Sequence, residues 1–342
     1  MRAALFMHPG DVRPTQLPDP TPAPGEVVVR VRACGVCGTD VHIFSGELTE
    51  GVVPPVVLGH EITGAIVELG PGVTQWAVGQ TVAVDPVVSC GRCEWCQIGQ
   101  PNLCAHATVI GYSRNGGFAQ YVAVPASHIV GLGDGLSPKA GLLVETLACL
   151  LNGYERLGFR AGASALILGA GTVGLLWNQL LKCSPSSLLI QTEPVAYRRR
   201  KALDLGANLV IDPVSESVAE RVREVSPEGV DFVVDASGDP AAIEEGIGLV
   251  RKGGTFLIFG IAPKEAVIRL HPHDIYQREM RIVASKMPPR KLNAAARLLE
   301  SGKIDYGAIV TTTKGIGAVA EAFEAFEKSR DSAVKIAIDP DE

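Results

Sequence analysis

The sequence predicts an α/β protein in which a small all-β domain is combined with a doubly wound parallel sheet. Residues 1–140 are rich in Val, Gly and Pro and contain short runs of alternating polarity, which is typical of twisted β-sheets. After Gly141 the pattern changes to apolar strands separated by helix-like segments, which is typical of βα repeats. The length of 342 residues also fits two domains, because one domain usually takes about 150 residues.

In the first part, the clearest strand candidates are Glu26–Arg32 and Gln80–Val84, and the turn pairs Pro24-Gly25 and Pro71-Gly72 punctuate this region. The second part begins with a helical stretch, Leu142–Leu157, and ends with two amphipathic helices and a closing strand that we expect to pack back on the first domain. Its predicted strands are Ala165–Leu168, Leu188–Ile190, Leu209–Ile211, Phe232–Val234 and Thr255–Ile258, and the late elements are Lys291–Ser301, Ala318–Lys328 and Ala333–Ile338.

The composition is that of a folded protein without a strong charge bias. Hydrophobic residues make up 46% and charged residues 20%, which excludes a mainly disordered chain. The formal net charge is −6, and an acidic chain lacks the basic surface that a nucleic acid backbone requires, so we expect no nucleic acid partner. The basic run 198–201 (Arg-Arg-Arg-Lys) is either a solvated helix face or a place that attracts one phosphate.

Nothing in the sequence predicts insertion into a membrane or export. A bilayer span takes about 18 apolar residues without charges, and no segment approaches this length. The segment Met1–Pro9 is too short to form a signal peptide, because its apolar residues are soon interrupted by His8 and Pro9. We therefore expect a cytoplasmic protein with no membrane partner, whose eight cysteines are free thiols or metal ligands rather than disulfides.

The most specific motif is a set of four closely spaced cysteines, Cys90, Cys93, Cys96 and Cys104. Four thiolates in one short loop can close tetrahedrally around a Zn²⁺ ion, and a site with four protein ligands has no open position. We therefore predict a structural zinc site. Free thiols, disulfides and an iron-sulfur cluster are the alternatives.

A second set of potential metal ligands is dispersed along the chain. Cys37 is followed by Thr39 and His42, and the pair His60-Glu61 comes later. Glu145 lies inside an apolar helix, where a carboxylate is costly unless it is paired or ligated. Together they form a Cys, His, Glu set with one position left for water or substrate. A buried ion pair or a hydrogen-bonded helix start is the alternative for Glu145.

A third motif follows the predicted strand Ala165–Leu168 and opens a helix. It has the pattern GxGxxG and consists of Gly169, Ala170, Gly171, Thr172, Val173 and Gly174. In this context the first glycine allows a tight turn, the second lets the backbone approach a pyrophosphate, and the third lets helix and strand pack. The motif predicts dinucleotide binding.

The choice of dinucleotide depends on the end of the next strand. Glu193 can accept hydrogen bonds from the adenosine ribose hydroxyls and would repel a 2′-phosphate, which favours NAD. Arg198, Arg199 and Arg200 point to NADP, because one of them could reach that phosphate. We predict NAD, with NADP as the alternative.

With these motifs, the chain resembles the zinc-dependent medium-chain dehydrogenases, a superfamily of alcohol, polyol and threonine dehydrogenases. The resemblance runs along the whole length. It rests on Cys37-Gly38-Thr39-Asp40, the Gly59-His60-Glu61-x-x-Gly64 motif, the four cysteines, Gly116–Ala119, the GxGxxG unit and the turn Arg251–Thr255. It implies a GroES-like catalytic domain formed by residues 1–148 and 286–342, with a zinc lobe at about 88–106, and a Rossmann domain at 149–285.

The resemblance also implies roles for single residues. Cys37, His60 and Glu145 occupy catalytic zinc positions, and Glu61 is a second carboxylate able to ligate. Thr39 and His42 are similar to a proton relay from the substrate oxygen through the nicotinamide ribose to solvent. The residues expected to line the cofactor at strand ends are Ala236, Ser237, Gly238, Phe259, Gly260 and Ser285. The implied reaction is hydride transfer from an alcohol whose oxygen is bound to zinc.

The third ligand position indicates the substrate class. The segment Glu145-Thr146-Leu147 is most similar to the polyol, sorbitol-type branch, whose usual sequence there is Glu-Pro-Leu. We therefore predict oxidation of a secondary carbinol of a polyol, cyclitol or sugar derivative to a ketone. A threonine or 2,3-butanediol-type dehydrogenase is the alternative within the enzyme class. A zinc- and nucleotide-binding sensor or scaffold without catalysis is the alternative outside it.

Several further residues have less specific expectations. Phe44, His271, His273 and Arg281 are either substrate contacts or surface and interface residues, and we favour the latter. Cys34, Cys149 and Cys183 are expected to be buried small hydrophobes. The superfamily forms dimers and tetramers, and the apolar segment Thr255–Ile261 predicts a homo-oligomer, with a tetramer favoured over a dimer.

Overall fold

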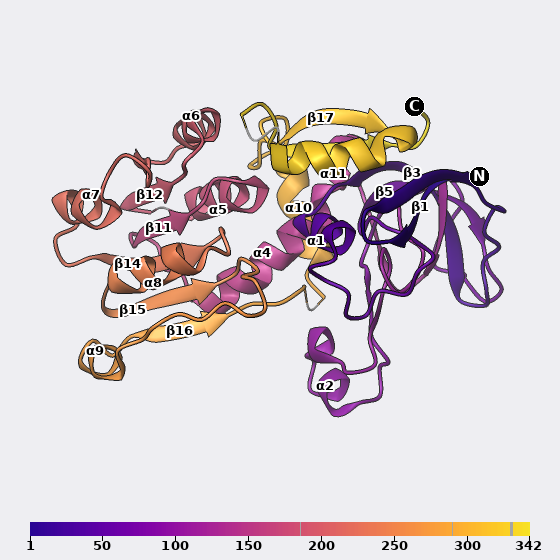
Figure 1. Ribbon diagram of the computed structural model, residues 1–342. Helices are drawn as coiled ribbons and strands as arrows, with labels where there is room; N and C mark the ends of the chain where they lie inside the picture. The colour runs from indigo at the N-terminus through magenta and orange to yellow at the C-terminus, as the bar shows by residue number, and fades with distance from the viewer. Residues whose placement is uncertain (185, 289, 329–330) are drawn as a thin grey trace. The chain divides into compact units, whose positions relative to one another are not determined.

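The computed structural model describes residues 1–184, 186–288, 290–328 and 331–342 and divides into two compact units. Unit 1 consists of Met1–Ala148, Met287–Gly302 and Tyr306–Glu342, and unit 2 of Cys149–Lys286 with Lys303–Asp305. Figure 1 colours the chain from indigo to yellow, so the early and late segments of unit 1 stand out in purple and yellow. Unit 1 therefore combines the two ends of the chain.

The largest sheet of unit 1 is where these two ends meet. Its strands are β3 (Glu26–Gly35), β5 (Glu61–Leu69), β6 (Thr81–Val84), β9 (Tyr121–Pro125), β10 (Ile129–Gly131), β17 (Val310–Gly315) and β18 (Lys335–Asp339). The order is β10-β6-β5-β3-β18-β17, and β9 also pairs with β3. Gly35 of β3 faces Ala337 of β18 on one side and Glu61 of β5 on the other. Three remote segments of sequence thus become neighbouring strands.

Smaller sheets and short helices complete unit 1. One small sheet consists of β1 (Arg2–His8), β2 (Asp11–Gln16) and β4 (Val56–Val57), and another of β7 (Val87–Val88) and β8 (Thr108–Val109). The helices are α1 (Gly38–Ser45), α2 (Glu94–Gln97), α3 (Pro138–Gly141), α4 (Leu143–Leu157), α10 (Leu292–Glu300) and α11 (Val319–Lys328), with 3-10 turns at Pro101–Leu103 and Ile316–Ala318. Helix α4 continues into unit 2. The alternating inward side chains of the strands form one core, in which Phe118 packs on Phe323 of α11 with 5.9 Å between ring centroids.

Unit 2 is a parallel six-stranded sheet in the order β13-β12-β11-β14-β15-β16. Its strands are β11 (Ser164–Leu168), β12 (Leu188–Thr192), β13 (Leu209–Ile211), β14 (Val230–Asp235), β15 (Val250–Ile258) and β16 (Arg281–Ala284), and its helices are α5 (Thr172–Cys183), α6 (Ala196–Asp204), α7 (Val218–Val225), α8 (Pro240–Gly248) and α9 (Pro272–Gln277). The chain order reverses between β11 and β14, so ligands are expected at the carboxyl ends of these strands.

The predicted fold class, an all-β GroES-like part with a doubly wound parallel sheet, is confirmed by this topology. The sequence did not predict β16, because its apolar run at 282–284 is only three residues long and its side chains are half-buried or exposed at the edge of the sheet. The predicted strand Thr255–Ile258 is the end of the longer β15. Among the described residues, no helix is both long and apolar enough to cross a membrane.

Candidate active site and metal centres

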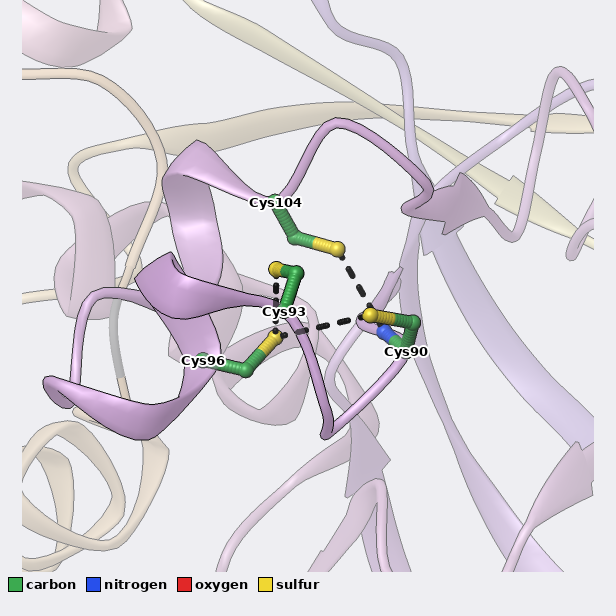
Figure 2. A group of neighbouring side chains, drawn as sticks. All are labelled: Cys90, Cys93, Cys96 and Cys104. Carbon is green, nitrogen blue, oxygen red and sulfur yellow. Dashed lines mark hydrogen bonds between the residues drawn. The ribbon is translucent and has the colours of Figure 1, made fainter.

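The four predicted zinc cysteines lie together in the lobe that contains α2 (Figure 2). Their sulfur atoms all lie within 4.8 Å of one another, and those of Cys93 and Cys96 are 3.5 Å apart. Tetrahedral zinc with bonds of about 2.3 Å places its sulfur ligands about 3.8 Å apart, so this cluster has the right size and chemistry for zinc. Hydrogen bonds from backbone N–H groups of Arg92 and Cys93 lower the pKa of Cys90 to about 6, which favours its thiolate. At Cys93 the backbone N–H of Cys96 also lowers the pKa, but burial and hydrogen bonds to the neighbouring cysteines outweigh it and raise the pKa of Cys93 to about 11. All eight cysteines of the chain are free thiols.

A second cluster in unit 1 brings together three of the dispersed residues. One ligand atom each of Cys37, His60 and Glu61 lies within 4.8 Å of the other two. Cys37 is the N-cap of α1, and His60 directly precedes β5, which begins at Glu61. Thiolate, imidazole and carboxylate are the donors that catalytic zinc sites use, so the residues present fit this metal.

Asp40 links the two loops that supply Cys37 and His60. Its carboxylate is fully buried and accepts hydrogen bonds from the backbone N–H groups of Cys37, at 2.9 Å, and of Gly59, at 3.3 Å. The same carboxylate lies 3.6 Å from Nδ1 of His60, close enough for its charge to act on the imidazole. Burial opposes the charged imidazolium, but Asp40 and Cys37 outweigh it and hold the pKa of His60 well above its usual range.

Glu145 is placed differently from Glu61. It lies in the first turn of α4 and is buried, yet among the described residues it is not part of the cluster within 4.8 Å. The charges of both Glu145 and His60 act on the phenol of Tyr112, whose pKa is raised mainly by burial. The two carboxylates that the sequence left as alternatives are therefore both near this site, with Glu61 nearer to Cys37 and His60.

Glu61 has two polar partners that sequence reasoning missed. Thr146, the neighbour of Glu145, donates a hydrogen bond from Oγ1 to Oε1 of Glu61 at 2.9 Å. Nζ of Lys335, on β18, contacts both oxygens of the Glu61 carboxylate. Burial lowers the pKa of Lys335, but the charges of Glu61 and Cys37 outweigh burial and raise it. The one available signal was a lysine in the otherwise apolar segment Ala333–Ile338.

The two residues of the expected proton relay lie on α1. Thr39 and His42 are both half-buried, and Nδ1 of His42 lies 2.5 Å from Oε2 of Glu47. The helix ends at Gly46, whose φ of 85° turns the chain back, and the N–H of Leu48 then bonds to the carbonyl of His42. This turn carries Glu47 to the imidazole, a contact that the sequence did not predict.

In unit 2, the glycine-rich turn joins β11 to α5 as its pattern predicted. Gly169 has a φ of 96°, which disfavours any other residue, and a Cβ on Gly174 would lie only 2.1 Å from the carbonyl oxygen of Gly169. Gly171 is the N-cap of α5, so Thr172 and Val173 begin the helix. The N–H groups at the first turn of a helix can hold a phosphate.

The residues that decide between NAD and NADP lie beside this turn. Glu193 is buried after β12 and accepts hydrogen bonds from the N–H groups of Ala170, at 2.7 Å, and Val195, at 3.0 Å. Of the three arginines, Arg199 binds the carbonyl of Glu193 and pairs with Asp212. Arg200 is exposed, whereas Nη1 of Arg198 would lie 3.8 Å from a Cβ at Gly171. Arg198 thus lies next to Gly171 of the glycine-rich turn.

The other predicted cofactor residues lie at the carboxyl ends of β14, β15 and β16. Asp235 accepts hydrogen bonds from the N–H groups of Ser237 and Gly238, and its carbonyl accepts one from the N–H of Gly260. Phe259 packs edge-on against Trp177 with 5.5 Å between centroids. Ser285 accepts a hydrogen bond from Asn152 at 3.0 Å. These residues follow the neighbouring strands β14, β15 and β16 at the carboxyl edge of the sheet, and β14 is one of the two strands between which the strand order reverses.

A parallel sheet with a glycine-rich turn of the dinucleotide-binding pattern, in one chain with a Cys, His, Glu cluster, is typical of a metal-dependent, nucleotide-linked oxidoreductase. Residues 23–134 match the family model of the alcohol dehydrogenase GroES-like domain, and residues 172–301 match that of the zinc-binding dehydrogenase. The chain belongs to this zinc-binding, medium-chain alcohol dehydrogenase family and is an NAD(P)-linked dehydrogenase. The predicted family and enzyme class are confirmed.

The relatives include enzymes that act on different alcohols. The chain is 35% identical to L-threonine 3-dehydrogenase of Pyrococcus horikoshii, over 89% of each chain, and 34% identical to D-altritol 5-dehydrogenase of Agrobacterium fabrum, over 88% of each. Its structure is similar to that of a zinc-binding dehydrogenase from Sinorhizobium meliloti 1021 bound to NADP, with 34% identity, a TM-score of 0.94 and 99% of each chain covered.

Proposed function

We propose that the protein oxidises a secondary alcohol of a polyol, cyclitol or sugar derivative to a ketone and transfers the hydride to a nicotinamide cofactor. The observation that carries the proposal is the donor set of Cys37, His60 and a buried carboxylate. Oxygen ligands exchange readily and suit a metal that accepts two neighbouring hydroxyls. The 34% identity to D-altritol 5-dehydrogenase supports the same substrate class.

A threonine dehydrogenase is the second candidate, and the 35% identity to L-threonine 3-dehydrogenase favours it. A 2,3-butanediol-type activity belongs to the same group of alternatives. All of these reactions use the same metal chemistry on a secondary alcohol and differ in the pocket around it. The substrate panel described below separates them.

In this proposal Cys37 and His60 hold the catalytic zinc together with Glu61 or Glu145. The bound ion supplies Lewis acidity, which makes the alcohol a better hydride donor. Asp40 keeps His60 oriented for ligation. Thr39 and His42 carry the proton of the alcohol to solvent, and Glu47 holds Nδ1 of His42 so that Nε2 faces the proton donor.

The second metal has a structural role in the proposal. Cys90, Cys93, Cys96 and Cys104 would hold a zinc ion with four protein ligands and no open position. The ion then stabilises the fold of residues 88–106 and takes no part in the reaction. Two zinc ions per chain follow from this assignment.

We propose that unit 2, the Rossmann domain, binds the dinucleotide, with NAD as the preferred form. The buried carboxylate of Glu193 beside the glycine-rich turn supports NAD, because a 2′-phosphate would lie next to its charge. Arg198 beside Gly171 supports some use of NADP, as does the NADP bound to the Sinorhizobium relative. Gly169, Thr172, Ser237, Phe259 and Ser285 line the cofactor in this proposal.

We also propose a homo-oligomer in the cytoplasm, with a tetramer favoured over a dimer. The apolar side chains Ile261, Val267, Leu270 and Tyr276 are exposed in the segment that precedes the edge strand β16. An open edge strand with apolar neighbours suits pairing with a second copy. The cytoplasm suits eight cysteines that form no disulfide. Light scattering tests the oligomer, and a monomer would contradict it.

The proposed function is tested on protein whose zinc has been counted by elemental analysis. Polyols, cyclitols, L-threonine, 2,3-butanediol and simple primary alcohols are compared by kcat/KM with NAD and with NADP. We expect two zinc ions per chain and the highest kcat/KM for a polyol or cyclitol with NAD. One zinc per chain without turnover would instead favour a sensor or scaffold.

A further inference from the structure

Asp235, the last residue of β14, has a carboxylate whose two oxygens have different surroundings. Oδ1 accepts three hydrogen bonds of 2.8 to 3.0 Å, from the N–H and hydroxyl groups of Ser237 and from the N–H of Gly238. Oδ2 accepts none from the residues that the structure describes, although the side chain is fully buried. A buried acceptor without a donor is costly, so one in a native fold calls for an explanation.

No cation pairs with this carboxylate within the described part of the chain. The other acidic residue of β14 differs in this respect, because Asp231, at the opposite end of the strand, pairs with Arg160 and Arg251. A charge without a partner acts strongly on other charges nearby, since the effective dielectric constant inside a protein is well below that of water. Asp235 therefore places an uncompensated negative charge at the carboxyl end of β14.

This charge lies where the turns at the carboxyl edge of the sheet come together. A Cβ at Gly260 would lie 2.8 Å from Oδ2 of Asp235 and 2.4 Å from the backbone nitrogen of Gly238, so the turns after β14 and β15 are in contact. The N–H of Gly260 also bonds to the carbonyl of Asp235, at 2.9 Å. A Cβ at Gly169 of the glycine-rich turn would lie 3.4 Å from Cβ of Ser237. The carboxylate is thus part of the edge that binds the dinucleotide in the proposed function.

The order of the strands indicates which half of the dinucleotide is nearby. Glu193, which follows β12, is the residue proposed to contact the adenosine ribose, and the glycine-rich turn after β11 is proposed to hold the pyrophosphate. The two halves of a dinucleotide lie on opposite sides of the point where the strand order reverses. Since β14 and β15 lie on the side away from β12, we expect the nicotinamide half on the side of Asp235.

The nicotinamide ring is positively charged in the oxidised cofactor and neutral in the reduced cofactor. We propose that the charge of Asp235 makes the cofactor site discriminate between these two forms and favours the oxidised one. The negative charge attracts the cationic ring and has no such effect on the neutral ring. The site then binds NAD⁺ more readily and releases NADH more readily, which suits alcohol oxidation. Asp235 is a specificity-determining residue in this inference, which rests on the proposed function of unit 2.

The experiment measures cofactor binding rather than turnover. Dissociation constants for NAD⁺, NADH and ADP-ribose, which lacks the nicotinamide ring, are measured by isothermal titration calorimetry on the zinc-loaded 342-residue chain. Asp235→Asn removes the charge and keeps the shape of the side chain, and Asp235→Thr is a second neutral variant that keeps one acceptor oxygen. Asp239→Asn is the matched control, because Asp239 is exposed and asparagine is an equally good N-cap for α8.

Two unit charges roughly 10 Å apart change an affinity about tenfold at an effective dielectric constant of about 20. We therefore expect both Asp235 variants to bind NAD⁺ at least about fivefold more weakly than the wild type, with little change for NADH and ADP-ribose. Asp239→Asn should match the wild type with all three ligands.

The inference is decided by whichever of the two Asp235 variants folds. Equal weakening of NAD⁺ and NADH would overturn it, because a carboxylate that only supports the turns affects both forms alike. Unchanged affinity for NAD⁺ would also overturn it. Wild-type protein that binds none of the three ligands would instead contradict the proposed function.

Discussion

Asp40 and His60 form a buried carboxylate–imidazole pair, with 3.6 Å between Oδ1 and Nδ1. Outer partners of this kind fix the orientation of a ligating histidine, and their loss typically costs 10- to 100-fold in metal affinity. We therefore expect Asp40→Asn, which keeps the shape of the side chain, to lose zinc affinity by about that factor. Zinc retained after dialysis against a chelator measures the effect. Glu50→Gln, on an exposed loop, is the control, and equal zinc loss in both variants would contradict this role.

The same pair predicts how metal binding depends on pH. His60 must be neutral to bind zinc, and its pKa in the metal-free chain is raised well above the usual range. Protons therefore compete with the metal already near neutral pH, and zinc affinity at this site falls as the pH falls. We expect the zinc at Cys37 and His60 to be lost at a higher pH than an ordinary histidine site would lose it. Retention of this zinc down to pH 5 would be incompatible with the raised pKa.

Glu193 and Arg198 predict opposite effects on the choice of cofactor. Replacing Glu193 by Gln removes the charge that opposes a 2′-phosphate, so we expect the ratio of kcat/KM for NADP to that for NAD to rise at least about tenfold. Arg198→Ala should lower the use of NADP and change the use of NAD little. Arg200→Ala is the control, because Arg200 is exposed. The assignment fails if Glu193→Gln and Arg200→Ala give the same ratio.

Asp85 predicts a pH dependence of stability. Burial raises its pKa from 3.8 to about 7. The folded state therefore holds the proton more tightly than the unfolded state, and this stabilisation is full below pH 3.8 and is lost as the pH rises through 7. Asp85→Asn cannot ionise and does not lose this stabilisation. Relative to the wild type, its free energy of unfolding should therefore increase between pH 4 and pH 8, by at most roughly 4 kcal/mol. Urea denaturation at several pH values measures the gain, and the exposed variant Asp134→Asn should show none.

The contact between His42 and Glu47 allows a test of the proposed proton relay. We expect His42→Ala to lower kcat about 10- to 100-fold, because a general base typically contributes at least that much. Added imidazole should restore part of the rate. Glu47→Gln should cause a smaller loss, since the imidazole remains but is no longer held by a carboxylate. A His42→Ala enzyme with undiminished kcat would remove His42 from the mechanism.

Local sequence predicted the features that depend on local chemistry. The glycine-rich turn lies where its strand and helix context placed it, because only glycine fits at Gly169 and Gly174. The four cysteines converge because they are close along one loop. The proximity of Cys37 to His60 could be expected only through the family resemblance, since Asp40 joins two loops whose pairing no local pattern encodes.

Contacts between remote strands escaped prediction for the same reason. Glu61 and Lys335 are separated by 274 positions and meet because β3 lies between their strands. Strand order within a sheet depends on the whole fold, so a lysine in an apolar segment indicates a buried partner but not which residue that partner is. Glu47 was missed because the return of the chain after Gly46 depends on how α1 ends.

The most direct test of the account is kcat/KM for a polyol, for L-threonine and for a simple primary alcohol with NAD, on protein with its zinc content measured. We expect two zinc ions per chain and a kcat/KM for the polyol at least about tenfold above the other two, a difference of roughly 1.4 kcal/mol in transition-state stabilisation. A higher kcat/KM for L-threonine would favour the second candidate function, that of a threonine dehydrogenase. A simple primary alcohol as the best substrate would contradict the account.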